Sequence, residues 1–418
     1  MHFKSHYYLQ IRFEIQRISQ LPIKTLIFKG LEKILGFVVG VALLPATILF
    51  HLIGFRYVNI FTNRIGHLAL EPDTLLKAEN LGLISGRKWI ILAPPGQTAN
   101  THLLSYWSKH FIVFSNYFAC FFVKSMVISG LMKYDVTKYL RASGETQAAY
   151  EIQKRWGGRQ PLLKLTGLDL LWGDEQFKSL GLPVDVWFVC VHVRENGFSP
   201  VDDEIQCYRN GSITKIIPAI EEITRRGGWV IRIGDSNMEP LPKLPNVIDY
   251  AHHPMKSDRL DVILCARARF ILGNTSGIAL VGTVFGVACA LANIAPVSVL
   301  WFMKDDISIP KMHWSFKLNR YLRLDELLES DVATFQFSKQ FEYAGIRLEE
   351  NKPEDIVNLV KEMFDQISGQ SEISPLGRYL QNQVKSMFKQ NFHYGYNSAA
   401  NMAASFLCDH PELLKLES

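Results

Sequence analysis

A histidine and an arginine end an apolar run at residues 192–194, HVR, and together they suit an anionic ligand. The guanidinium of Arg194 offers a planar set of donors that fits phosphate oxygens and stays charged at any relevant pH. His192 shares its strand face, because side chains alternate along a strand with period two. The alternative is a surface pair in which Arg194 bridges to Glu195, since structural ion pairs are common.

A second polar stretch, RIGDS, follows another apolar run at residues 232–236. Gly234 relieves the turn after the strand, and Asp235 or Ser236 can accept a hydrogen bond from a ribose or cap a helix. A plain Asx turn is an equally good interpretation.

The third stretch, LGNTSG at residues 272–277, places Asn274, Thr275 and Ser276 before Gly277 and an expected helix. Free N–H groups at a helix start, together with small hydroxyls, suit a phosphate. The alternative is an ordinary N-cap by Thr275 or Ser276. Neither of the common glycine-rich nucleotide fingerprints occurs in the chain.

Strands that alternate with helices must position these three stretches. The pattern predicts strands at 184–193, 229–236, 246–251 and 289–295, another around 270–273, and helices at 212–228, 258–268 and 278–288. Such alternation indicates βαβ units and a mostly parallel sheet in an α/β fold. Ligands bind at the carboxyl ends of strands in these sheets. The three stretches are therefore expected to meet in one crevice with room for a diphosphate, which indicates a nucleotide or nucleotide-sugar site.

The composition is that of a globular protein with no strong bias. The chain has 418 residues, 48% hydrophobic and 20% charged, with a net charge of +5 that does not argue for nucleic acid. Its six cysteines lack the spacing of a zinc site, and a reducing compartment is the simplest account. Weaker alternation in the N-terminal half completes a division into four parts, at 1–60, 61–182, 183–345 and 346–418.

Residues 34–55 carry no Asp, Glu, Lys or Arg, and their length suits a membrane span of roughly 20 residues. The preceding segment is basic, which keeps that end cytoplasmic by the positive-inside rule. Three interpretations stay open: a true span, a helix pair kinked at Pro45 that lies on the membrane, and a buried helix of a soluble protein.

The order of several short motifs resembles known glycosyltransferases. HVRENG is similar to the H-x-R segment of fucosyltransferase-type enzymes, and GNTSG to a downstream turn in them. The layout also resembles a bacterial glycosyltransferase family, through Arg64–Ala69 (RIGHLA), His192–Arg194, Tyr208–Asn210 (YRN) and Arg232–Asp235. The resemblance covers roughly residues 60 to 345 and implies a GT-B arrangement of two facing Rossmann-like domains. One departure, Glu195 where a second basic residue is usual, weighs against a GDP-fucose donor.

The resemblance also implies roles for the parts. The C-terminal Rossmann-like domain would bind the donor, and Arg64, Gly66, His67 and Glu71 of the first would border the acceptor side. The alternative for His67 is a helix-cap or surface histidine. Residues 346–418 would pack as helices back on the first domain.

The chemistry expected is transfer of a hexosyl or deoxyhexosyl group from a nucleoside diphosphate to a glycan, lipid-linked or surface-polysaccharide acceptor. Arg194 and the Thr275–Ser276 turn would stabilise the leaving diphosphate without a metal, and no cofactor is expected. His192 and Glu195 complete the expected catalytic group, and the general base stays open among Glu71, Glu195 and His67. The alternative function is a membrane-associated nucleotide-sugar-binding or scaffold protein without transfer activity.

The donor also indicates the compartment. Bacterial sugar nucleotides are cytoplasmic, and a single span with a cytoplasmic N-terminus would place the catalytic domains on the other side. Asn210 and Asn274 begin glycosylation sequons, but a glycan on Asn274 would block the expected phosphate turn. The sequence therefore favours the cytoplasmic face of the inner membrane, contacted through residues 20–55.

Overall fold

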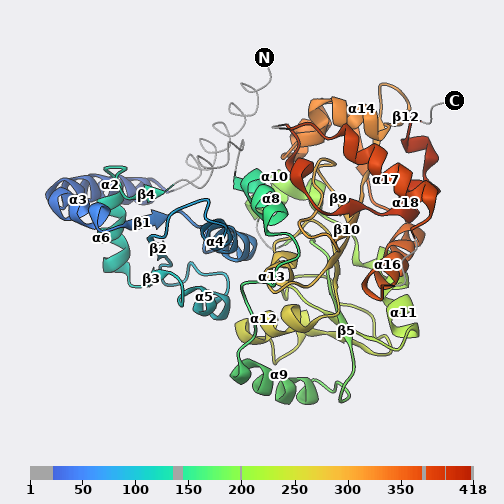
Figure 1. The fold of residues 1–418 in the computed structure, drawn as a ribbon, viewed down its shortest axis with the longest axis horizontal. Helices are drawn as coiled ribbons and strands as arrows, with labels where there is room; N and C mark the ends of the chain where they lie inside the picture. Colours follow the sequence, from blue (N-terminus) through green and yellow to red (C-terminus); the bar gives the residue numbers. More distant parts are fainter. Residues whose placement is uncertain (1–21, 135–144, 198–199, 370–372, 391, 416–418) are drawn as a thin grey trace. The chain divides into compact units, whose positions relative to one another are not determined.

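The computed structural model describes residues 22–134, 145–197, 200–369, 373–390 and 392–415, which divide between two compact units (Figure 1). The first unit comprises Met1–Asn59, Arg87–Gln97 and His110–Tyr134, and the second comprises Ile60–Gly86, Thr98–Lys109 and Asp135–Ser418. The boundaries expected at residues 60 and 182 are therefore not those of the compact units. The apolar N-terminal segment belongs to the same unit as a sheet, and residues 60–86 belong to the larger unit.

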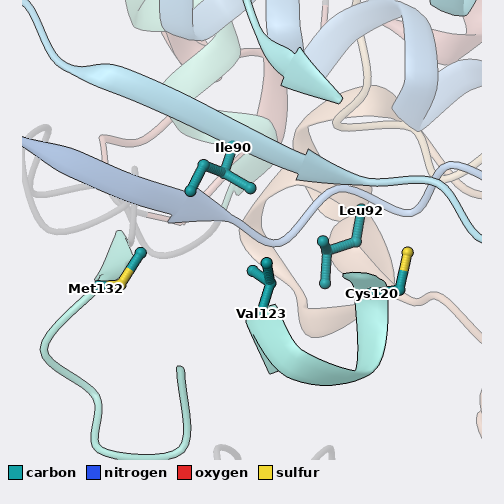
Figure 2. Close-up of a cluster of buried hydrophobic side chains, with 5 residues drawn as sticks. All are labelled: Ile90, Leu92, Cys120, Val123 and Met132. Atoms are coloured by element: carbon teal, nitrogen blue, oxygen red, sulfur yellow. The ribbon is translucent and has the colours of Figure 1, made fainter. Parts of the chain in front are cut away.

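In the part of the chain that the structure describes, the first unit has a parallel four-stranded sheet and three helices. The strand order is β3-β2-β1-β4. Its elements are α2 (Ile23–Ala42), α3 (Leu44–Leu52), β1 (Phe55–Val58), β2 (Lys88–Leu92), β3 (Ile112–Phe114), α6 (Tyr117–Val127) and β4 (Lys133–Tyr134). Figure 2 shows the core, in which Ile90 and Leu92 of β2 face Cys120 and Val123 of α6, with Met132 beside them.

The apolar N-terminal segment folds as a bent pair of helices. The axes of α2 and α3 differ by 66° across the break at Leu43, and Pro45 lies in the first turn of α3, where its missing N–H leaves no helical hydrogen bond unmade. Among the described residues no single helix is long and apolar enough to cross a membrane, although the bent pair together has the length and composition. The kinked helix pair expected around Pro45 is therefore present.

The second unit is built on a parallel seven-stranded sheet of order β14-β10-β9-β8-β5-β6-β7. Its strands are β5 (Phe188–His192), β6 (Trp229–Arg232), β7 (Val247–Asp249), β8 (Ile271–Gly273), β9 (Cys289–Ile294), β10 (Ile307–Pro310) and β14 (Asn401–Met402). Every residue of β5, β8 and β9 is buried, because helices cover both faces of the sheet. The predicted α/β class with parallel sheets is confirmed, while the facing of two Rossmann-like domains stays a prediction.

Helices α11 and α16 cover one face of this sheet, and α12 and α13 cover the other (Figure 1). The α-helices of the unit are α4 (Ile65–Asn80), α5 (Thr101–Trp107), α8 (Glu145–Trp156), α9 (Gly167–Ser179), α10 (Pro200–Gln206), α11 (Ile217–Arg225), α12 (Asp258–Arg267), α13 (Ala279–Val284), α14 (Leu324–Glu329), α15 (Ser338–Tyr343), α16 (Pro353–Ile367), α17 (Pro375–Met387) and α18 (Ala404–Asp409). Short 3₁₀ turns lie at Cys207–Arg209, Ile213–Lys215, Tyr250–His252, Asp331–Thr334, Tyr394–Asn397 and Pro411–Leu413.

Two features of the second unit differ from the sequence-based expectations. An antiparallel sheet of order β12-β11-β13 follows the parallel one, with β11 at Met312–Ser315, β12 at Arg320–Tyr321 and β13 at Ile346–Glu349. The C-terminal segment adds strand β14 to the parallel sheet and packs α16 against α11, β9 and β10. Strand β14 therefore completes the seven-stranded sheet, and the turn at Tyr394–Asn397 contacts α8 of the segment assigned to the first domain.

Candidate functional site

The strand order of the seven-stranded sheet reverses between β5 and β8. The strands that follow β5 in the chain, β6 and β7, lie on one side of it, and β8 lies on the other. Loops leave such a switch point in opposite directions and open a crevice at the carboxyl edge of the sheet. His192 at the end of β5 pairs in register with Gly273 at the end of β8. The HVR and GNTSG stretches are therefore adjacent, as expected from the sequence.

Asn274 ties the two strand ends together. Its Oδ1 accepts a hydrogen bond from the backbone N–H of Arg194 at 2.9 Å, and its Nδ2 donates to the carbonyl of Arg209 at 3.1 Å. The side chain is 1% exposed. Asn274 thus fixes the backbone from which the Arg194 side chain projects, and its burial leaves no room for a glycan.

Asn210 connects two cationic side chains. Its Oδ1 accepts from Nε of Arg194 at 3.1 Å, and its backbone carbonyl accepts from Nζ of Lys311 at 2.6 Å. Lys311 directly follows β10, and burial lowers the pKa of its ammonium to about 8. The site therefore has two cations close together, and the sequence stretch YRN supplies the residue between them.

His192 is a buried, neutral histidine whose two ring nitrogens both bond to other groups of the protein. Its Nδ1 lies 3.1 Å from the carbonyl oxygen of Ile233, which can only accept, so Nδ1 carries the proton. Burial, together with the nearby positive charges of Arg232 and Arg194, lowers the pKa of His192 to about 4. Its Nε2 therefore accepts a hydrogen bond from the hydroxyl of Ser276, with 2.8 Å between Nε2 and Oγ. His192 positions Ser276.

The two hydroxyls of the GNTSG turn differ in their surroundings. Neither caps the following helix, because α13 begins at Ala279 with Ile278 as its N-cap and no side-chain cap. The N-cap interpretation of Thr275 and Ser276 is therefore wrong. Ser276 donates to His192, whereas Oγ1 of Thr275 is buried and bonds to no protein group in the described chain. Thr275 retains a hydroxyl proton for a ligand, and Ser276 presents lone pairs.

A buried arginine supports the end of β5 from the neighbouring strand. Arg232 is 0% exposed, and its guanidinium lies 3.2 Å from Asp249 and 3.6 Å from Glu195. Glu195 also accepts from the backbone N–H of Glu239 at 2.8 Å, and burial raises the pKa of its carboxyl. A buried charge that loses its partner is strongly destabilising. In this geometry Glu195 holds the strand ends together.

The RIGDS turn approaches His192 closely. Gly234 has φ +151°, and a Cβ there would lie 2.4 Å from Sδ of Met238 and 3.3 Å from Nδ1 of His192, so only glycine fits. Oδ1 of Asp235 accepts from the backbone N–H of Asn237 at 2.9 Å, which is the Asx turn. Ser236 is exposed beside it.

The RIGHLA motif begins helix α4, which lies in the same unit as the GNTSG turn. A Cβ on Gly66 would lie 2.8 Å from Cα of Gly277, so the two glycines let the backbones touch. The next residue, His67, is hydrogen-bonded through Nδ1 to Glu71 one helical turn later, and its side chain is 43% exposed. Arg64 is the exposed N-cap residue of the helix. The structure thus brings a histidine–carboxylate pair to the helix end beside the turn.

A cavity of about 510 Å³ adjoins Lys311 in the second unit. It is lined by Lys215, Lys311, Met312, Tyr321, Leu348, Glu349, Glu350, Lys352, Asp355, His410 and Glu412. Lys311 is therefore shared between the cavity and the Arg194–Asn210 contact. Among the described residues, no three His, Cys, Asp or Glu side chains gather in a way that could hold a metal ion.

No protein-family model and no curated protein matches this chain. Among solved structures, a glycosyl transferase family 9 protein from Veillonella parvula DSM 2008 is similar over 52% of this chain and 59% of its own length. The sequence identity is 14% and the TM-score 0.28, and a likeness of this degree carries no argument. The function is therefore argued from the geometry of the site.

Two residues of the site had no role in the sequence-based prediction. Asn210 belongs to the YRN stretch, which marked the resemblance without suggesting a contact. Lys311 directly follows the buried strand Ile307–Pro310, just as Arg194 follows the strand that ends at His192. A cation immediately after an apolar run was therefore the available signal in both cases.

Proposed function

We propose that this chain is a glycosyltransferase that takes its sugar from a nucleoside diphosphate. The observation that carries the proposal is that Arg194 and the buried Thr275 hydroxyl each follow, by two residues, the paired strand ends His192 and Gly273 at the β5–β8 switch point. A fixed guanidinium and a hydroxyl donor suit the oxygens of a diphosphate, whose charge grows as the glycosidic bond breaks. Metal-independent transfer stays part of the proposal.

The contacts of the site support a placement for the rest of the donor. Lys311 and Arg194 both donate hydrogen bonds to Asn210, so a second cation is available to the diphosphate. In the adjoining cavity, Tyr321, Met312 and Leu348 could contact the nucleobase of the donor, and the carboxylates could accept hydrogen bonds from its ribose hydroxyls. Ser276, which donates to His192, is suited to accept a hydrogen bond from a hydroxyl of the donor.

His67 is the general base in this proposal, oriented by Glu71. The other candidates are engaged, since Glu195 faces Arg232 and Glu71 accepts a hydrogen bond from Nδ1–H of His67. Nε2 of His67 takes the proton of the acceptor hydroxyl, and the acceptor oxygen bonds to the anomeric carbon. The bond from that carbon to the diphosphate oxygen breaks, and its electron pair leaves with the diphosphate.

The acceptor is proposed to be a glycan or a lipid-linked saccharide at the cytoplasmic face of the membrane. The bent helix pair α2–α3 supports this placement, because it is apolar and has many exposed apolar side chains. Residues 20 and 21 of the expected membrane contact lie outside the described residues.

A screen of the full-length protein against sugar nucleotides, with hydrolysis and transfer as readouts, tests the proposal. His67→Gln should retain nucleotide binding and lose about 100-fold in turnover. Arg155→Ala, on an exposed arginine of α8 paired with Glu151, is the matched control for Arg194→Ala. Nucleotide binding without any turnover would instead favour a nucleotide-sugar-binding or scaffold protein, and no binding at all would contradict both.

A further inference from the structure

Helix α2 contacts the protein almost entirely through glycine. Gly36 and Gly40 are its buried residues, while its large apolar side chains point away from the protein. Those more than half exposed are Ile23, Ile27, Phe28, Leu31, Ile34, Leu35, Phe37, Val38 and Val41. A helix that is apolar around most of its surface is normally covered by other protein or by lipid.

The two glycines form the packing surface between α2 and α6. A Cβ on Gly40 would lie 2.4 Å from the carbonyl oxygen of Ser125, and one on Gly36 would lie 3.6 Å from the Ser125 hydroxyl. Small residues spaced four apart allow this close approach of helix backbones and are typical of helix pairs in membranes. Gly36 and Gly40 therefore serve the packing of α2 on α6.

Helix α6 carries exposed aromatic side chains on one face and core residues on another. Tyr117, Phe118 and Phe122 are 61%, 76% and 47% exposed, whereas Cys120 and Val123 pack on the sheet (Figure 2). Helix α3 adds Leu49 and Leu52, which are 57% and 74% exposed. We call these exposed apolar side chains of α2, α3 and α6 the apolar face of the first unit.

The charges around the apolar face suit anionic lipid. Residues 34–55 carry no Asp, Glu, Lys or Arg, and the N-terminal part of α2 presents Lys24, Lys29 and Lys33 beside a single acid, Glu32. Basic side chains next to an apolar helix bind negative headgroups while the apolar side chains enter the acyl boundary. Exposed apolar side chains that gather on helices packed together mark a surface that contacts protein or membrane.

We propose that α2, α3 and α6 enter one leaflet of an anionic bilayer together, with the α2–α6 glycine contact fixing them as one membrane-docking surface. This extends the proposed contact of the α2–α3 pair to a third helix, for which the sequence indicated no membrane contact. Membrane docking itself does not depend on the proposed function. Only its consequence, that the acceptor is taken from the plane of the membrane, rests on that function.

Flotation of the full-length protein with vesicles tests this inference. The vesicles are phosphatidylcholine containing about one quarter phosphatidylglycerol. The double variant Phe118→Lys, Phe122→Lys should reduce the floated fraction at least threefold. The control Val184→Lys, Tyr343→Lys changes apolar residues that are 75% and 76% exposed in the second unit, and it should float like the wild type. Equal flotation of all three proteins overturns the inference.

A conservative variant covers the case in which the lysine variant does not fold. Phe118→Trp should show additional fluorescence quenching by brominated lipid relative to the wild type, and Tyr343→Trp should not. If the lysine variant instead has a lower molecular mass in solution than the wild type and floats normally, the apolar face binds a second copy of the chain and the inference is wrong. Donor hydrolysis in detergent should be the same for the lysine variant and the wild type, so this test and that of the proposed transferase activity fail separately.

Discussion

The hydroxyl of Ser276 lies 2.8 Å from Nε2 of His192, across the paired ends of β5 and β8. Because Nδ1 of His192 faces a carbonyl oxygen, this Nε2 can only accept, and the serine proton points into the protein. The adjacent Thr275 hydroxyl has no such partner among the described residues. Two neighbouring hydroxyls thus have opposite hydrogen-bonding roles toward a ligand.

Substitutions of the two hydroxyl residues should therefore separate binding of phosphate from binding of sugar. Thr275→Val should weaken binding of a nucleoside diphosphate about tenfold, because a donor to a charged group is lost. Ser276→Ala should leave that affinity nearly unchanged and should weaken binding of the sugar nucleotide. Calorimetric titration with both ligands measures the difference, and equal effects of the two variants on both ligands would refute the division of roles.

Glu195→Gln should leave both the fold and the chemistry intact. The substitution removes a charge that burial disfavours, retains an acceptor for the Glu239 N–H, and leaves Asp249 beside Arg232. A loss of roughly 1 to 3 kcal/mol in the free energy of unfolding is expected for Glu195→Ala, which leaves that N–H without its acceptor. Denaturant unfolding and turnover are measured together. A stable Glu195→Gln protein without turnover would identify Glu195 as the base instead of His67.

Acid should destabilise the folded state between about pH 6.5 and pH 4. Burial lowers the pKa values of His192, His313 and His393 to about 4, so the unfolded chain binds protons first as the pH falls. Each histidine then contributes a loss on the order of 3 kcal/mol. Asp306, whose pKa burial raises to about 7, acts in the opposite direction.

The comparison that isolates this effect is between the wild type and His313→Gln, by denaturant unfolding at pH 7 and pH 5. The wild type should lose more stability than the variant over this interval, because the variant has one depressed histidine fewer. An equal loss in the two proteins would show that the pKa of His313 is not lowered in the folded protein.

Gly66→Ala should push the start of α4 away from the GNTSG turn. A Cβ at this position would lie 2.8 Å from Cα of Gly277, which belongs to backbone and cannot rotate away. Overpacking of this kind costs about 1 to 3 kcal/mol. The matched control is Gly82, where positive φ strains a side chain but nothing lies within 4 Å. Turnover should fall more for Gly66→Ala than for Gly82→Ala, and similar turnover in both would contradict a role for the contact.

The sequence predicted the seven-stranded sheet well because its signals are local. The apolar runs that end at His192, Arg232 and Gly273 are buried strands, and each is followed by the polar turn that was expected. Because parallel strands place their carboxyl ends at one edge, the proximity of HVR and GNTSG followed from the topology alone. The expected strands and helices between residues 184 and 295 all occur, most of them shorter.

The contacts that long-range packing creates were not predictable. Asn210 reaches Arg194 and Lys311 from a loop, and no period in the sequence marks such a contact. The packing of Gly36 and Gly40 on α6 was not evident either, because α6 lies far from α2 along the chain. The division into compact units also escaped prediction, since α4 leaves the sheet of β1 and β2 and packs on α13.

The most direct test of a diphosphate site at the β5–β8 switch point is calorimetric titration of the full-length protein with GDP, UDP and dTDP. At least one nucleotide should bind the wild type and Arg155→Ala with equal affinity, and it should bind Arg194→Ala at least tenfold more weakly, since a charge-assisted pair to phosphate is lost. If no nucleotide binds the wild type, or if Arg194→Ala binds as tightly as Arg155→Ala, the proposed site is contradicted.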